Sequence, residues 1–383
     1  MIDGVRRIAV FRALQLGDLL VAVPALRALR AGYLDAEITL IGLPWAASLA
    51  AHLNRYVNHF LPFPGYPGIE EVAYDEGRTA LFIEEARAYK YDLVVQMHGS
   101  GGQSNPFALA LGGRVTAGYY ESPQHPSYPV GHHPSSRARE RGGEGLPPAG
   151  LSPAAPYPHM QPEVLRNLGL VALLGCPDRG AALEFPLTDA DRAEAAALLD
   201  ALSATGRPLI GLHPGARPPA RRWPPARFAA VADALARRHG ARVVLTGGPG
   251  EEETTAAVAR AMATAPLDAA GRTSLGGLAA LIARLDLFIG NDTGPAHLAE
   301  AVGTPSVRLF GPADPLRWAP LDLQRHAVVR RPVPCSPCPH WECPIDHRCL
   351  RLIEPADVVR ATEGVLASAK PLQFYAREGV CGA

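Results

Sequence analysis

Short apolar runs alternate with longer segments of helical periodicity along most of the chain. Strands are predicted at residues 7–13, 36–42, 91–99, 208–216, 241–250, 285–292 and 305–311. The segment that follows the first of these runs is apolar and is expected to end as a helix near Gly32. Strands that alternate with helices are typical of βαβ units and a parallel sheet. We therefore expect an α/β protein with doubly wound sheets.

The length of the chain predicts more than one domain. At 383 residues it exceeds the usual size of a single hydrophobic core. Residues 187–206 have a polar start, helical periodicity and a glycine end, so this helix is expected at the junction between two domains. The predicted parts are an N-terminal domain at 1–186, a linker helix region at 187–207, a C-terminal domain at 208–354, and a C-terminal helix and tail at 355–383.

Residues 121–160 interrupt the alternating pattern. They are dense in Pro, Gly, Ser and His. This composition favours a disordered insertion, and the alternative is a mobile flap beside a binding site.

Composition and charge narrow the class of function. Apolar residues make up 48% and charged residues 19%, and Lys plus Arg equals Asp plus Glu at 37 each. A net charge of zero argues against a nucleic-acid-binding protein. The N-terminus runs directly into an apolar strand pattern, and no apolar run approaches the ~20 residues that span a bilayer. We expect a cytoplasmic protein without a transmembrane segment, whose membrane contact would be peripheral.

The stretch "FIGNDTGPAHLAEAVGTPSVRLFG" at 288–311 contains a strand, a polar glycine turn, a helix start and a second strand. Asp292 or Thr293 can cap the helix, Gly294 leaves room for a ligand, and His297 lies on the helical face of Thr293. Free N–H groups and the positive end of the helix dipole would form a phosphate cradle. The alternative is ordinary helix capping without a ligand.

Three further strand ends carry candidate chemistry. "LHPGARPPARRWPP" (212–225) holds Arg217, Arg221 and Arg222, which suit phosphate oxygens or form a solvated basic loop. "TGGPGEEE" (246–253) places glutamates at a helix start, where they favour the dipole or accept hydrogen bonds from ribose hydroxyls.

Asp18, in the glycine turn after the first strand, is either an N-cap residue or a general base. It could act as a base only if the two domains face each other across the substrate.

Four of the six cysteines fall in one loop, at Cys335, Cys338, Cys343 and Cys349. The C-x2-C-x4-C-x5-C spacing could surround one tetrahedral zinc ion, and free thiols or redox-dependent pairing are the alternative. Zinc knuckles have nearly this spacing, but the neutral net charge counts against nucleic-acid binding.

These motifs together resemble the ADP-heptose-dependent lipopolysaccharide heptosyltransferases of glycosyltransferase family nine. The matching stretches follow the order of the family's motifs along nearly the whole chain. They are "GDLLVAVPALRALR" (17–30), "PGARPPARRWPPARF" (214–228), "GGPGEEE" (247–253), "GNDTGPAHLAEAVGTPSVRLFGP" (290–312) and "CSPCPHWECPIDHRCLRLIEPADV" (335–358). The cysteine-rich tail looks more like that of the heptosyltransferase II type, which adds the second heptose, than like that of the enzymes that add the first.

The resemblance implies a GT-B fold, with two Rossmann-like domains that face each other across a cleft. The N-terminal domain would bind the acceptor and the C-terminal domain the nucleotide-sugar donor. Family members transfer heptose from ADP-heptose to the inner core of lipid A, a Kdo- or heptose-bearing acceptor at the inner leaflet, with inversion at the anomeric carbon. No Asp-x-Asp metal motif follows a predicted strand, because Asp189-Ala190-Asp191 lies at the start of the helix expected at 187–206, so no cofactor is expected for catalysis.

The resemblance also assigns roles by position. Asp18 matches the catalytic base, and Arg221 stands where the family usually has a lysine that contacts the donor phosphate. Glu251 matches the ribose-binding glutamate. Asp292, Thr293, Gly294 and His297 match the diphosphate-binding turn, and we also assign Gly17, Gly215, Ala216 and Arg222 to donor binding.

Two other functions remain open from the sequence. One is a family-nine-type enzyme that uses another nucleotide sugar or acceptor. The other is a non-catalytic nucleotide- or zinc-binding protein, which would leave Asp18 without an obvious purpose.

Overall fold

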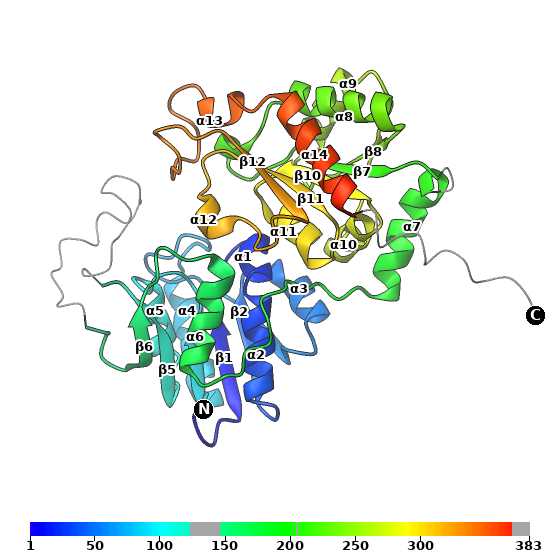
Figure 1. Cartoon of the computed structure of the whole chain (residues 1–383). Coiled ribbons are helices and arrows are strands. Elements are labelled where there is room, and N and C mark those ends of the chain that lie inside the picture. The colour runs from blue at the N-terminus through cyan, green and yellow to red at the C-terminus, as the bar shows by residue number, and fades with distance from the viewer. Residues whose placement is uncertain (123–145, 204–205, 370–383) are drawn as a thin grey trace, which may run out of the picture. The chain divides into compact units, whose positions relative to one another are not determined.

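The computed structural model describes residues 1–122, 146–203 and 206–369. The chain divides into two compact units, Met1–Pro186 and Leu187–Ala383. Each unit is an α/β layer structure with one parallel sheet (Figure 1).

The first unit contains a six-stranded parallel sheet in the order β3-β2-β1-β4-β5-β6. Its strands are β1 (Arg7–Phe11), β2 (Glu37–Gly42), β3 (His59–Pro62), β4 (Leu93–Gln96), β5 (Val115–Tyr120) and β6 (Leu151–Pro156). Its helices are α1 (Leu16–Leu20), α2 (Val23–Gly32), α3 (Ala46–His52), α4 (Glu76–Tyr89), α5 (Ser104–Ala110) and α6 (Glu163–Leu173).

The central strands of this sheet are apolar on both faces because helices cover both. All four residues of β4 are buried, as are the last five of β2. Figure 1 shows α2 and α6 side by side, and the two helices pack against each other. The rings of Phe11, Phe63 and Phe107 meet in the core with centroids 4.5–5.2 Å apart.

The second unit repeats this architecture, with the sheet order β12-β11-β10-β7-β8-β9. Its strands are β7 (Leu209–His213), β8 (Arg242–Leu245), β9 (Leu267–Asp268), β10 (Leu287–Asn291), β11 (Ser306–Phe310) and β12 (His326–Arg330). Its helices are α7 (Asp189–Ser203), the 3-10 helix η2 (Pro219–Arg221), α8 (Pro225–His239), α9 (Glu252–Ala261), α10 (Leu275–Ala283), α11 (Gly294–Ala301), α12 (Pro315–Trp318), α13 (Arg348–Arg351) and α14 (Pro355–Ala369). The C-terminal helix α14 packs on α8 and β12 within this unit.

Both sheets have the doubly wound strand order, which confirms the predicted fold class. The order reverses between β1 and β4 in the first unit and between β7 and β10 in the second. Ligands of such sheets bind beyond the carboxyl ends of the strands at this switch point. Asp18 follows β1, Gly215 follows β7 and Asp292 follows β10, so these three predicted site residues lie at the two switch points, whereas Glu251 follows the neighbouring strand β8.

All seven predicted strands are confirmed, but the prediction for residues 121–160 is wrong in part. Residues 151–156 form β6, the edge strand that pairs with β5. Its prolines, at 153 and 156, are tolerated because an edge strand has one side without a ladder partner. Residues 123–145 lie outside the described part of the chain. Among the described residues, no helix is long and apolar enough to cross a membrane.

Candidate active site

The turn after β10 leads directly into the first turn of α11. Asp292 is buried, and its N–H donates to the carbonyl of Leu309 at 3.1 Å. Thr293 takes the N-cap position, but its hydroxyl donates to the carbonyl of Asn291 at 3.3 Å and makes no side-chain cap. The side chain of Thr293 therefore does not occupy the amide groups at the start of α11, where the helix dipole favours an anion.

His297, one turn into α11, is a neutral hydrogen-bond donor. The guanidinium of Arg308 lies 3.3 Å from His297 Nδ1. Because arginine can only donate, Nδ1 is the unprotonated nitrogen and Nε2 carries the proton. Nε2 lies 3.9 Å from Oδ1 of Asp292. Burial, together with the positive charges of Arg308 and Arg221, holds the pKa of His297 well below its usual range.

Glu251 faces the turn after β7 from the start of α9. Its Oε2 accepts a hydrogen bond from the N–H of Gly248 at 2.8 Å and lies 3.5 Å from Nε2 of His213. Burial lowers the pKa of His213, and the neighbouring Glu251 opposes that shift. A Cβ atom on Gly215 would lie 2.2 Å from Oε1 of Glu251. Glycine at 215 is therefore required for the carboxylate to come this close to the turn.

The three arginines after β7 have different environments. Nη1 of Arg221 lies 3.3 Å from the main-chain oxygen and 3.8 Å from carboxylate Oδ2 of Asp292. Arg222 donates from Nε to the carbonyl of Ala216 at 2.8 Å, and Arg217 lies over the ring of Trp341. The structure thus brings Arg221 to the turn after β10, whereas Arg222 holds the turn after β7.

Asn291, which sequence reasoning did not single out, connects these segments. It is fully buried at the end of β10. Its Nδ2 donates to the carbonyls of Pro214 at 2.9 Å and Gly215 at 3.2 Å, and its Oδ1 accepts from the N–H of Trp223 at 3.1 Å. A polar residue at the end of an otherwise apolar strand was the available signal. The same side chain therefore holds the turn after β7 and the segment that follows Arg221.

In the first unit, Asp18 lies in the first turn of α1, and Gly17 beside it is buried. Oδ2 of Asp18 accepts a hydrogen bond from the N–H of Gln15 at 3.2 Å, which makes it part of a capping box. The predicted alternative of an N-cap aspartate is wrong in position, because Gln15 is the N-cap residue. Asp18 is half-buried.

His98, at the end of β4, is a second neutral donor that the sequence did not reveal. Its Nδ1 accepts a hydrogen bond from the N–H of Ala13 at 3.2 Å, so the proton is on Nε2. Nε2 lies 3.9 Å from Oε1 of Glu71, and the ring stacks on Phe11. Burial, with a smaller effect of the positive Arg12, lowers the pKa of His98 to about 3.

Comparison with known proteins identifies the family of the chain. The model of glycosyltransferase family 9 (heptosyltransferase) matches residues 151–348, about half of the chain. The chain belongs to glycosyltransferase family 9.

Two relatives of this family-9 chain are lipopolysaccharide heptosyltransferases 3 of Escherichia coli. One is 36% identical over 169 residues, which cover 43% of this chain and 48% of the relative. The other, from strain K12, is 28% identical over 362 residues, which cover 93% of this chain and 96% of the relative.

The solved structure of E. coli ADP-heptose LPS heptosyltransferase II has the same fold as the family-9 chain. It superposes with a TM-score of 0.69 at 21% identity and covers 94% of this chain and 98% of that one. The likeness confirms a GT-B type of fold with two doubly wound units.

The cysteine loop of this family-9 chain does not have the geometry of a metal site. In the described part of the chain, no three His, Cys, Asp or Glu side chains are grouped so that they could hold a metal ion. Cys335, Cys338, Cys343 and Cys349 are free thiols. Burial raises the pKa of Cys349 to about 11 and also raises that of Cys338, which favours protonated thiols. The structure therefore does not support the zinc site that the cysteine spacing suggested.

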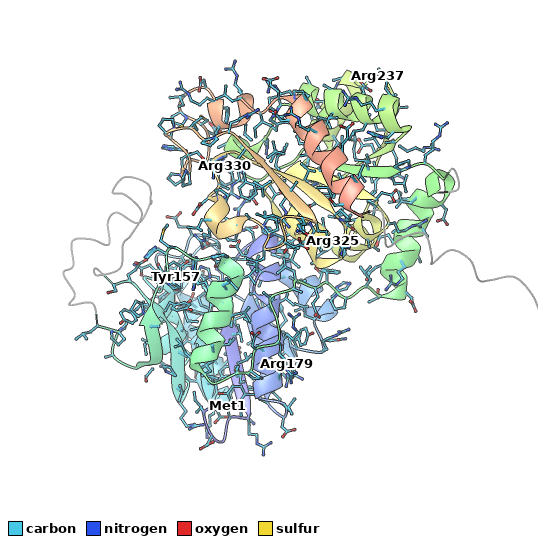
Figure 2. The ribbon with its side chains drawn as sticks, viewed as in Figure 1. Met1, Tyr157, Arg179, Arg237, Arg325 and Arg330 are labelled. Atoms are coloured by element: carbon cyan, nitrogen blue, oxygen red, sulfur yellow. The ribbon has the colours of Figure 1, made fainter. Side chains whose placement is uncertain are left out.

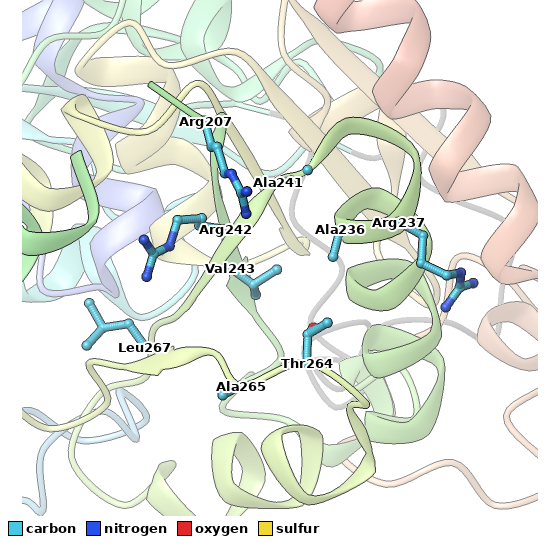
Figure 3. A pocket seen from close by; sticks show the side chains of 10 residues that line it. Arg207, Ala236, Arg237, Ala241, Arg242, Val243, Thr264, Ala265 and Leu267 are labelled. Carbon is cyan, nitrogen blue, oxygen red and sulfur yellow. The ribbon is translucent and has the colours of Figure 1, made fainter. Parts of the chain in front are cut away.

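A pocket of about 450 Å³ lies at the amino ends of the strands of the second sheet, away from the turns that follow β7 and β10 (Figure 3). Its lining includes Arg207, Arg237 and Arg242, near the start of β8 and the end of α8. Of these three, Arg237 lies in the last turn of α8, where a positive side chain complements the helix dipole. The predicted donor residues follow the carboxyl ends of the strands, so this pocket is not their site.

Proposed function

We propose that this chain is an inverting glycosyltransferase that moves heptose from ADP-heptose to the inner core of lipopolysaccharide. The observation that carries the proposal is the turn after β10 in a member of glycosyltransferase family 9. That turn combines a helix N-terminus without a Thr293 side-chain cap, the neutral donor His297 and the cation Arg221. The name of a similar solved structure, ADP-heptose LPS heptosyltransferase II, supports the choice of sugar nucleotide, and two relatives are named lipopolysaccharide heptosyltransferases.

The donor would bind at the switch point of the second unit. Its diphosphate would accept hydrogen bonds from the amide groups at the start of α11 and from Arg221, which stabilise the charge that grows as ADP leaves. Glu251, fixed beside the turn after β7, would accept hydrogen bonds from the ribose hydroxyls. Gly215 and Ala216 would give the nucleotide close access to the backbone.

The reaction would be a single displacement at the anomeric carbon. The carboxylate of Asp18 would take the proton from the acceptor hydroxyl as that oxygen attacks the carbon. The bond from the carbon to the diphosphate oxygen breaks on the opposite face, and ADP leaves with the electron pair. No covalent enzyme intermediate forms, so the configuration at the anomeric carbon is inverted.

The acceptor would be a lipid A-core molecule at the inner surface of the inner membrane. Cytoplasmic location with peripheral membrane contact follows from that acceptor. The cysteine-rich tail resembles enzymes that act after the first heptose, and two relatives carry the name heptosyltransferase 3. An acceptor that already bears heptose is therefore the first to assay, beside acceptors with none and with two.

The test combines nucleotide binding with turnover. We expect ADP, but not UDP, GDP or CMP, to raise the melting temperature, because a ligand at a hundredfold excess over Kd adds about 2.7 kcal/mol of stability. ADP-heptose should then be consumed with a lipid A-core acceptor. A shift with UDP or GDP alone would overturn the donor, and a shift with none would overturn nucleotide binding.

Asp18→Asn tests the base. This variant should lose about 10²- to 10⁴-fold in kcat, the usual contribution of a general base, while its ADP-induced thermal shift is retained. Asp35→Asn, which changes an exposed carboxylate in the same unit, is the matched control and should keep wild-type turnover. Wild-type turnover in the Asp18→Asn variant would remove Asp18 from the mechanism.

A further inference from the structure

A buried guanidinium joins the two strand ends at the switch point of the first unit. Arg12 directly follows β1, and only 1% of its surface is exposed. Its Nε donates to the main-chain carbonyl of Asp18 at 2.7 Å, and its Nη1 donates to the carbonyl of Met97. Met97 directly follows β4. One side chain therefore fixes the first turn of α1 relative to the end of β4.

Helix α6 holds this guanidinium from the other side. Nη1 of Arg12 also donates to Oδ1 of Asn167 at 3.2 Å, and Nη2 lies 3.3 Å from Oε1 of Glu163. Both partners are buried. Nδ2 of Asn167 donates in turn to the carbonyl of Val21 at 3.3 Å, the C-cap residue of α1. Arg12, which α6 holds in place, thus contacts the first turn of α1, and Asn167 of α6 contacts its C-cap residue.

Helix α1 needs this support because it has only five residues. A helix so short does not stabilise itself, since the hydrogen bonds of its own turns barely offset the cost of nucleation. Its position over the sheet must therefore come from tertiary contacts. Arg12 suits this task better than lysine, because its planar fork can donate to several acceptors in fixed directions.

We propose that Arg12 is a positioning residue for the carboxylate of Asp18. It acts through the main chain of α1, and Asn167 assists it at the other end of the helix. This inference rests on the proposed function, in which Asp18 removes the proton from the acceptor hydroxyl. A displacement of about 1 Å at such a group can cost about 10²-fold in rate, so small shifts of α1 matter.

Arg12→Lys keeps the positive charge and removes the planar guanidinium, whose Nε and Nη1 donate to several acceptors. We expect kcat to fall about 10²-fold, while the KM for ADP-heptose and the thermal shift with ADP stay within about twofold, because the donor residues lie in the second unit. Asn167→Ala, which removes one anchor and leaves Arg12 in place, should lower kcat less, by about three- to tenfold. If Arg12→Lys does not fold, Asn167→Ala decides the question by the same measurements.

Arg166→Lys is the matched control. Arg166 is also buried and also pairs with Glu163, and its guanidinium donates to Tyr157, Pro158, His159 and Gln161. Tyr157 is labelled beside α6 in Figure 2. This variant should lower the melting temperature about as much as Arg12→Lys and keep kcat within about threefold of wild type.

A double-mutant comparison separates positioning from a merely structural role. If Arg12 acts through Asp18, Arg12→Lys should not lower the residual rate further in the Asp18→Asn background. The proposal is wrong if Arg12→Lys lowers the rate by the same factor in the wild-type and Asp18→Asn backgrounds. It is also wrong if Arg166→Lys lowers kcat as much as Arg12→Lys does. Failure of the proposed function is distinguishable, because wild-type protein would then not turn over ADP-heptose at all.

Discussion

At the residue scale, His297 and His98, each near a switch point, are neutral hydrogen-bond donors. In His297 the guanidinium of Arg308 occupies Nδ1, and in His98 the N–H of Ala13 does so. Burial lowers the pKa of both, that of His98 to about 3. Each therefore presents a proton on Nε2 throughout the physiological pH range. Neither is suited to be a general base, which agrees with the proposal that the carboxylate of Asp18 takes that role.

Gly215 gives the sharpest test of the donor site at this scale. In Gly215→Ala the added methyl would lie 2.2 Å from Oε1 of Glu251, so the carboxylate or the turn must move. We expect the Kd for ADP to rise about tenfold, equivalent to about 1.4 kcal/mol, as measured by calorimetric titration.

The control for this change is Gly364→Ala in α14, where an added Cβ meets no atom within 4 Å. It should leave the Kd for ADP unchanged and stabilise the helix slightly. If Gly215→Ala bound ADP as tightly as wild type, Glu251 would not need its observed position for nucleotide binding.

At the element scale, a buried polar side chain spans the switch point in each unit. Arg12 does so in the first, and Asn291 in the second, where it holds the turn after β7 to the end of β10. Loops at the carboxyl ends of parallel strands have few ladder bonds of their own, so such side chains fix their geometry. The functional turns are in this way attached to the rigid sheet.

Asn291→Asp tests the second of these connections. The aspartate would keep an acceptor for the N–H of Trp223 but could not donate to the carbonyls of Pro214 and Gly215. It would also place a charge in a fully buried position. We expect a loss of about 2–4 kcal/mol in the stability of the second unit and weaker ADP binding, measured by urea unfolding and titration. A stability within about 0.5 kcal/mol of wild type would contradict this account.

The sequence predicted elements well where periodicity is strong, and poorly where composition misleads. The apolar runs at 7–13 and 285–292 became β1 and β10, because burial on both faces requires continuous hydrophobicity. β6 was missed because "LSPAAP" has the composition of a loop, and only its pairing with β5 makes it a strand. The cysteine spacing suggested zinc, yet spacing does not determine the directions of the thiols.

The candidate site was predictable in part for a related reason. Glycine, aspartate and arginine at strand ends indicate ligand chemistry, and those residues do lie at the switch points. The side chains that hold them, such as Arg12 and Asn291, act through contacts between segments far apart in the chain. A polar residue at the end of an apolar strand can mark such a side chain, but a single sequence does not show which distant segment it contacts.

At the scale of the whole molecule, one strand order occurs twice, and the proposed function divides the chemistry between the two units. The second unit carries the turns proposed to bind the donor, and the first carries Asp18. The two units are therefore expected to respond differently to perturbation, with nucleotide stabilising the second. Each unit also contains a histidine whose pKa is lowered by burial, His98 in the first and His326 in the second. The free energy of unfolding of each unit should therefore depend on pH through its own residue.

His326, at the start of β12, makes the second unit sensitive to acid. Its Nδ1 lies 2.9 Å from Oγ of Ser306, and burial, followed by the positive charge of Arg308, lowers its pKa from 6.5 to about 3. The unfolded chain therefore binds a proton below about pH 6.5 that the folded chain does not. The stability that neutral His326 provides is complete above pH 6.5 and is lost as the pH falls toward 3, by at most about 1.4 kcal/mol per pH unit.

We therefore expect His326→Gln to reduce the pH dependence of the unfolding of the second unit between pH 7 and pH 5. The variant should be less stable than wild type at pH 7, and the difference should shrink by about 1–2 kcal/mol at pH 5, as measured by urea unfolding at each pH. His98→Gln, which removes the corresponding buried histidine of the first unit, should leave the pH dependence of the second unit unchanged. Parallel curves for wild type and His326→Gln would show that His326 does not resist protonation in the folded protein.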